Sequence, residues 1–208
     1  MLQHGSSTVD SSYSQPFDDI GPVSAPQTGS APYPEIGKML GDENNGPTTQ
    51  GNGLSYIRSC VNVQNYNIKA TREACDTFAK ITKENPEFKN SFFMFEKFPL
   101  DGVRAIPSES TAFPFRHDNI NVTPVAAYSN NSGNTELDAK ALAIGEKLRQ
   151  IIWLGSGQSE RHVYINYANG SEKREEWYGY EPWRLQKLEA LKKKYDPLGR
   201  FKFYAPLD

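Results

Sequence analysis

The order of apolar patterns after residue 53 limits the possible folds of this chain more than any other feature. Apolar side chains recur at helical spacing over residues 68–84 and 135–153, and again from Pro182 to Tyr195. Short runs typical of β-strands lie at residues 54–61, 91–98, 103–106, 122–128 and 162–167. No glycine-rich phosphate loop follows these runs, which argues against a parallel nucleotide-binding sheet. We therefore predict an α+β fold, with an antiparallel sheet backed by helices and followed by a C-terminal helix and tail.

Two of the predicted strands have unusual compositions. The run 91–98 holds four phenylalanines and a methionine among its eight residues, which predicts a strand with much of both its faces buried. Pro124 interrupts the run 122–128. Because proline cannot donate a hydrogen bond to a neighbouring strand, we expect this run to form an edge strand or to contain a bulge.

The first 52 residues differ in composition from the rest of the chain. Gly, Ser, Pro, Thr and Asn dominate them, and large apolar side chains are sparse. Such a segment buries too little apolar surface to offset the entropy lost on ordering. We predict an irregular, partly disordered segment held by a few anchors, which are Tyr13, Phe17, Ile20, Tyr33, Ile36 and Met39.

The overall charge argues against two classes of partner. The chain has 23 Lys and Arg against 25 Asp and Glu, a net charge of -2, so no basic field attracts nucleic acid or an anionic membrane. No stretch approaches the roughly 18 apolar residues of a transmembrane helix, and residues 1–10 lack the apolar core of a signal peptide. We predict neither a nucleic-acid nor a membrane partner.

Cysteines and glycosylation sequons indicate whether a chain passes through the secretory pathway. Cys60 and Cys75 are too few for a disulfide scaffold or a four-ligand zinc site, so buried free thiols are favoured and a single bridge is the alternative. Sequons begin at Asn121, Asn130 and Asn169. They weakly favour a secreted glycoprotein.

The stretch Tyr164-Ile-Asn-Tyr167 is the first candidate site. On a strand, Tyr164 and Asn166 share one face, which places a phenol beside a carboxamide. A tyrosine can act as a general base where nearby cations or donors stabilise its phenolate. The alternative is an ordinary half-buried strand. The three histidines lack metal-ligand spacing, and we predict no metal site.

The last 32 residues contain a second dense motif. Trp177-Tyr-Gly precedes a helix that contains Arg184-Leu and ends in Lys192-Lys-Lys-Tyr-Asp-Pro, and Phe201-Lys-Phe follows. By itself this is an amphipathic helix with a docking tail. Its lysine run is typical of a solvated C-terminal turn that complements the helix dipole.

Together these stretches resemble the C-terminal region of the berberine-bridge-enzyme-like FAD-linked oxidases, of the vanillyl-alcohol-oxidase superfamily. Thr111-Ala-Phe-Pro-Phe-Arg116 adds weaker support. The resemblance implies an irregular segment at 1–52, a partial substrate-binding domain at 53–160 and a berberine-bridge-type C-terminal segment at 161–208. It also implies that Tyr164 and Tyr167 are catalytic, with either one as the base, and that Asn166 contacts FAD.

Family resemblance further implies oxidation of an alcohol, sugar or amine carbon of a small-molecule substrate, by hydride transfer to FAD that oxygen reoxidises. The family's N-terminal FAD-binding domain and its flavin-linking histidine and cysteine have no counterpart in this sequence. We therefore expect an isolated chain to be inactive and to need a missing FAD-binding domain or chain. For a full-length family member, the resemblance favours the secretory pathway. The alternative functions are an inactive remnant and a carbohydrate- or partner-binding module that uses an exposed face of Trp177, Tyr178, Tyr180 and Trp183.

Overall fold

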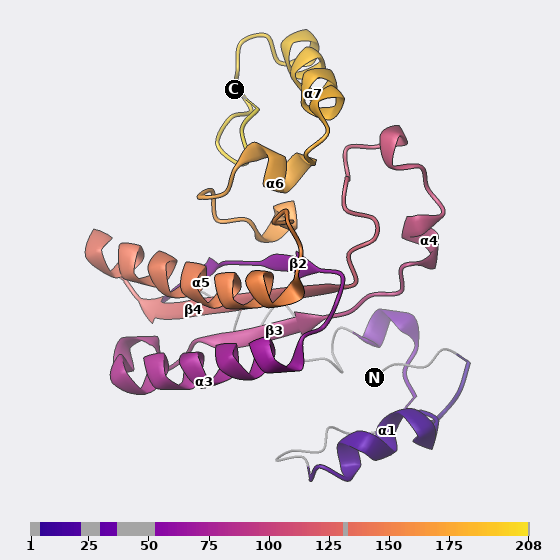
Figure 1. Ribbon diagram of the computed structural model, residues 1–208, viewed down its shortest axis with the longest axis vertical. Helices are drawn as coiled ribbons and strands as arrows, with labels where there is room; N and C mark the ends of the chain where they lie inside the picture. The colour runs from indigo at the N-terminus through magenta and orange to yellow at the C-terminus, as the bar shows by residue number, and fades with distance from the viewer. Residues whose placement is uncertain (1–4, 22–29, 37–52, 131–132, 208) are drawn as a thin grey trace. The chain divides into compact units, whose positions relative to one another are not determined.

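The structure, a computed structural model, describes residues 5–21, 30–36, 53–130 and 133–207 (Figure 1). The chain divides into two compact units, residues 1–52 and residues 53–208.

The first unit contains regular structure where an irregular segment is predicted. Helix α1 spans Ser11–Asp18, and a 3₁₀ turn, η1, spans Tyr33–Glu35. The carboxylate of Asp10 accepts a hydrogen bond from the Ser12 backbone N–H at 2.8 Å and so caps α1. Neither element has a buried residue. The predicted anchor Met39 lies outside the described residues.

The second unit is built around one long strand. Strand β4, Ile120–Ser129, lies at the centre of an antiparallel sheet. It pairs with β3, Phe92–Glu96, on one side, and with β1, Leu54–Arg58, and β2, Val61–Val63, on the other. The prediction of an antiparallel sheet is thus confirmed.

Pro124 lies inside this central strand, so the predicted edge strand or bulge is wrong. β1 and β2 keep one continuous register against β4, and no residue is inserted. The Ser59 backbone N–H donates to the Pro124 carbonyl at 3.1 Å. The reciprocal bond cannot form because proline has no N–H. The missing donor therefore coincides with the interruption between β1 and β2.

Two helices cover one face of the sheet (Figure 1). These are α3, Ile68–Glu84, and α5, Thr135–Ser156, and both are predicted from their apolar spacing. Asn67 and Asn134 cap their N-termini, and α5 ends at Gly157 in the left-handed conformation. The helices and the sheet bury an apolar core that includes Val61, Val63, Ala74, Val122 and Ile152.

Short elements complete the unit. They are η2, Pro86–Phe88; α4, Asp101–Arg104; η3, Ser108–Ser110; α6, Arg174–Tyr178; and α7, Pro182–Tyr195. The strand predicted at 103–106 is wrong, because the backbone N–H groups of Arg104 and Ala105 bond back to Leu100 and Asp101 and close a helical turn. The predicted burial of both faces of 91–98 is also wrong, since the β3 residues are half-buried or, like Phe95, 41% exposed.

Candidate functional site

The segment 162–167 forms a turn and not the predicted strand. His162 makes only an isolated bridge with Asn62 of β2, and Ile165–Tyr167 form a 3₁₀ turn, η4. The Tyr167 backbone N–H closes this turn on the Tyr164 carbonyl at 2.8 Å. A strand would have placed the two tyrosines on opposite faces, whereas the turn brings their side chains together.

A phenol and a carboxamide meet in this turn, as predicted, although the cause is different. The Asn166 Nδ2 donates to the Tyr164 hydroxyl at 2.7 Å. The rings of Tyr164 and Tyr167 lie edge to face, with centroids 5.3 Å apart. Tyr164 is half-buried and Asn166 is exposed. The Tyr164 oxygen therefore already accepts one hydrogen bond, from a neutral donor.

Tyr167 has a different environment, which includes Glu96, a residue that the sequence analysis does not single out. Its hydroxyl donates to Glu96 Oε1, at the end of β3, at 3.4 Å. The Arg58 guanidinium lies over its ring, 5.8 Å from the centroid. Burial, followed by the charge and hydrogen bond of Glu96, raises the pKa of Tyr167. Tyr167 is thereby held as a neutral hydrogen-bond donor.

The turn lies over the sheet face opposite α3 and α5. The strand registers place Asn62, Asn121 and Glu96 in one row across β2, β4 and β3 on this face. Asn121 Nδ2 donates to Asn62 Oδ1 at 2.7 Å, and the Thr123 hydroxyl donates to Asn121 Oδ1 at 2.5 Å. All three of these bonded residues are buried. The face beneath the tyrosines is therefore polar, unlike the face that packs against the helices.

The cysteines do not add chemistry to this site. Both Cys60 and Cys75 are free thiols, and Cys60 is fully buried among Val163, Trp177 and Tyr164. Burial raises the pKa of Cys60 to about 12. A thiol held neutral in this way is a poor nucleophile at neutral pH.

A buried ion pair fastens the turn to helix α5. Arg149 Nη1 lies 2.6 Å from Glu172 Oε1, and the two side chains are 1% and 0% exposed. Glu172 also accepts backbone N–H bonds from Asn169 and Gly170, directly after the tyrosine turn. Asn169 in turn donates to the Arg58 carbonyl at 2.9 Å. These bonds tie residues 169–172 to both α5 and β1.

A cavity of about 360 Å³ lies near the other end of this segment. His162 and Asp118 line it, with His162 Nδ1 2.9 Å from Asp118 Oδ1. The imidazole stacks on Phe115 with ring centroids 3.9 Å apart. One ring face and the Nδ1 atom of His162 are thus occupied by packing and pairing.

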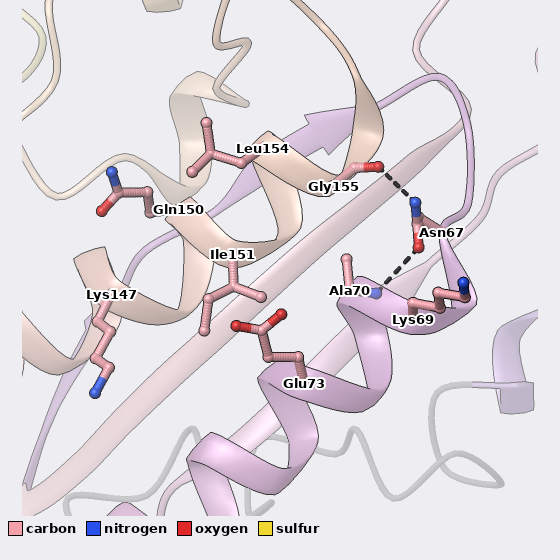
Figure 2. A pocket seen from close by; sticks show the side chains of 9 residues that line it. All are labelled: Asn67, Lys69, Ala70, Glu73, Lys147, Gln150, Ile151, Leu154 and Gly155. Carbon is pink, nitrogen blue, oxygen red and sulfur yellow. Dashed lines mark hydrogen bonds between the residues drawn. The ribbon is translucent and has the colours of Figure 1, made fainter.

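A wider groove of about 500 Å³ lies between α3 and α5, away from the tyrosines (Figure 2). Asn67 joins the two helices there, because its Oδ1 caps α3 at Ala70 and its Nδ2 donates to the Gly155 carbonyl at 2.8 Å. Figure 2 shows Lys147 and Glu73 on opposite helices at the rim. The groove has no concentration of buried polar groups and is explained by helix packing.

The proposed exposed aromatic face is not present, so the prediction that depends on it is wrong. Trp177 is 5% exposed, and the hydroxyls of Tyr178 and Tyr180 donate to the carbonyls of Ala205 and Arg161. Only Trp183, at 40%, is substantially exposed. The other rings are used to pack α6 and the tail, because their polar atoms find partners within the unit.

The described part of the chain contains neither a metal-binding cluster nor a membrane-spanning helix. No three His, Cys, Asp or Glu side chains there lie close enough together to hold a metal ion. No helix among the described ranges is long and apolar enough to cross a membrane.

Sequence comparison relates the whole chain to fungal proteins, while no family model matches it. The FAD-linked oxidoreductase chyH of Penicillium rubens is 38% identical over 207 residues, which cover 100% of this chain and 41% of that protein. The FAD-linked oxidoreductase chry5 of Gibberella zeae is also 38% identical, over 100% of this chain and 40% of its own length. The chain thus spans about two-fifths of the length of these curated relatives.

Structure comparison gives a consistent fold. The berberine bridge enzyme of Eschscholzia californica matches 83% of this chain and 37% of its own, with a TM-score of 0.60 and 17% identity. CrmK, a flavoenzyme of caerulomycin biosynthesis, matches 81% of this chain and 34% of its own, with a TM-score of 0.61 and 16% identity. At this identity the likeness concerns the fold alone.

Proposed function

The chain belongs to the berberine-bridge-type FAD-linked oxidoreductases, and we propose that it forms the substrate side of a flavin-dependent oxidase site. The observation that carries this proposal is the turn in which Asn166 donates to Tyr164 beside Tyr167. The chain spans about two-fifths of its relatives, so we propose that the remaining flavin contacts come from the part of those proteins that it does not match.

The residues of the turn fit a flavin-facing role. Asn166 is exposed, so its amide can still hydrogen-bond a cofactor, and the half-buried Tyr164 ring lies next to it. Buried polar side chains lie beneath them, at Asn62, Asn121 and Thr123. FAD, when bound, supplies the two-electron acceptor for a hydride from a substrate carbon. The protein groups of this chain then have to bind the substrate and remove a proton.

The hydrogen bonds of the two tyrosines indicate different roles, one as an acceptor and one as a donor. The Tyr164 oxygen accepts a hydrogen bond from the Asn166 amide, so a donor and not a carboxylate faces it. Tyr167 donates to Glu96 and has a raised pKa, so it keeps its proton. We therefore assign Tyr164 Oη as the base that takes the proton from a substrate hydroxyl or amine. Tyr167 acts as a neutral donor beside it.

The test replaces the matching segment of the Penicillium rubens relative with this 208-residue chain. The chimera is purified, its visible flavin absorbance is recorded, and peroxide release is measured with a panel of alcohols, aldoses and amines. We expect the chimera to carry flavin and the isolated chain to be colourless even with added FAD. A chimera that folds but takes up no flavin contradicts the proposal.

The base is tested in the same chimera. Removal of a general base typically lowers the rate by about 10²–10⁴-fold, so Tyr164→Phe should lose turnover on that order. Tyr195→Phe is the matched control, since Tyr195 is 72% exposed on α7. If Tyr164→Phe retains flavin and full turnover, the assignment of the base is wrong.

A further inference from the structure

Glu96 stands out as a carboxylate in an apolar strand. On β3 it shares the face of Phe92 and Met94, and it lies directly across from Asn121 in β4. It is half-buried. Burying a carboxylate costs free energy unless it is paired. Among the described residues it forms no ion pair, so its place needs another explanation.

The two oxygens of Glu96 differ. Oε1 accepts from the Tyr167 hydroxyl at 3.4 Å. Oε2 is buried and has no hydrogen-bond partner. Arg58 lies over the Tyr167 ring, with its guanidinium 5.8 Å from the ring centroid. The phenol is therefore the group that Glu96 engages.

This contact separates two otherwise similar tyrosines. Their rings touch within one turn, yet the hydroxyl of Tyr164 accepts from an amide and the hydroxyl of Tyr167 donates to a carboxylate. The groups that face Tyr167 are Glu96 and Tyr164, which raise its pKa, and Arg58, which lowers it. Apart from burial, Glu96 is the largest of these influences.

We propose that Glu96 is a positioning residue of the oxidase site, which holds the Tyr167 hydroxyl as a fixed donor and leaves Tyr164 as the one tyrosine able to accept a proton. The proposal rests on the function assigned above. It goes further, because it names a residue on a different strand, 71 positions away from Tyr167. The alternative is that Glu96 is only a strand residue whose carboxylate happens to lie near a phenol.

The experiment uses the full 208-residue chain and needs no flavin. Tyrosines are labelled with ¹³C at the hydroxyl-bearing ring carbon, and Tyr167→Phe identifies the Tyr167 signal. Its titration is followed to alkaline pH in the wild type and in Glu96→Gln. Removing the negative charge should lower the pKa of Tyr167. The exposed Glu109→Gln is the control and should leave the Tyr167 signal unchanged.

A charge-conserving variant separates positioning from packing. Glu96→Asp keeps the carboxylate, so Tyr167 should titrate close to its wild-type pKa. An unchanged titration in Glu96→Gln overturns the proposal, as does an equal shift in the Asp and Gln variants. If Glu96→Gln does not fold, the wild type and Glu96→Asp are compared instead. A wild-type Tyr167 that titrates at the ordinary tyrosine pKa also overturns the proposal.

The result of the Tyr167 titration can be told apart from the result of the chimera test. A chimera that loses no turnover in Tyr164→Phe would count against the base and leave the Glu96–Tyr167 titration unaffected. A failed titration combined with an active, Tyr164-dependent chimera would remove only the role of Glu96.

Discussion

Replacing Arg149 with methionine tests whether the buried ion pair anchors the tyrosine turn. Methionine keeps much of the apolar volume of the side chain and removes its charge. Glu172 is then left at 0% exposure without its cationic partner at 2.6 Å. Breaking a buried pair in this way costs about 3–5 kcal/mol, because one charge stays buried and uncompensated.

The structure places the expected cost near the lower end of that range. Glu172 keeps two backbone donors, from Asn169 at 3.2 Å and from Gly170 at 2.9 Å. The second acidic partner of Arg149 is Glu146, which is 44% exposed and also pairs with Arg161. We therefore expect Arg149→Met to lower the free energy of unfolding by about 3 kcal/mol, out of a total of about 5–15 kcal/mol.

Urea unfolding followed by circular dichroism measures this loss. With a slope of about 2 kcal/mol/M, the midpoint should fall by about 1.5 M. Lys80→Met is the control, because the Lys80–Glu84 pair is 73% and 59% exposed and should contribute less than about 1 kcal/mol. Adding Glu172→Gln to Arg149→Met should cost less than the sum of the single changes. Strict additivity, or an Arg149→Met effect as small as the control, would refute the reasoning.

Three further outcomes follow from the packing and the shifted pKa values. Gly145→Ala should destabilise the chain by about 1–3 kcal/mol in urea, since its new Cβ would lie 2.1 Å from the Ser59 Oγ; Ser59→Gly should restore part of the loss. Iodoacetamide at neutral pH should alkylate the half-buried Cys75 before Cys60, and equal rates in mass spectra would contradict this order. Burial raises the pKa of Cys60 from 9.0 to about 12 and also raises that of Tyr128 above 10.0. The stability that these neutral groups contribute is therefore fully present below about pH 9 and is lost as the pH rises above 9. The urea midpoint of unfolding should fall over that range, and a constant midpoint up to pH 12 would contradict this.

The parts of the fold that the sequence predicts well are those determined locally. The apolar spacing that predicts α3 and α5 lies within each helix. By contrast, the short runs at 103–106 and 162–167 are compatible with a strand or a turn, and only tertiary partners decide between them. His162 meets one residue of β2, and the chain then turns away.

The same distinction applies to the candidate site. Tyr164, Asn166 and Tyr167 are neighbours in the sequence, so their motif singles them out, although the backbone that joins them is a turn. Glu96 is contributed by a different strand. In the sequence it stands at the end of an apolar run, where a carboxylate is typical of a solvated strand end. Its contact with Tyr167 arises only once β3 and η4 are brought together.

The buried amide of Asn121 also bears on where this chain can be made. Asn121-Val-Thr is an acceptor for N-linked glycan, yet Asn121 is 9% exposed in the central strand and its Nδ2 is bonded to Asn62. An oligosaccharide on that nitrogen would remove the bond and force a bulky group into the buried layer on the sheet face opposite α3 and α5. Transfer of the glycan precedes folding in the endoplasmic reticulum. Hence in that compartment a molecule modified at Asn121 could not close its sheet.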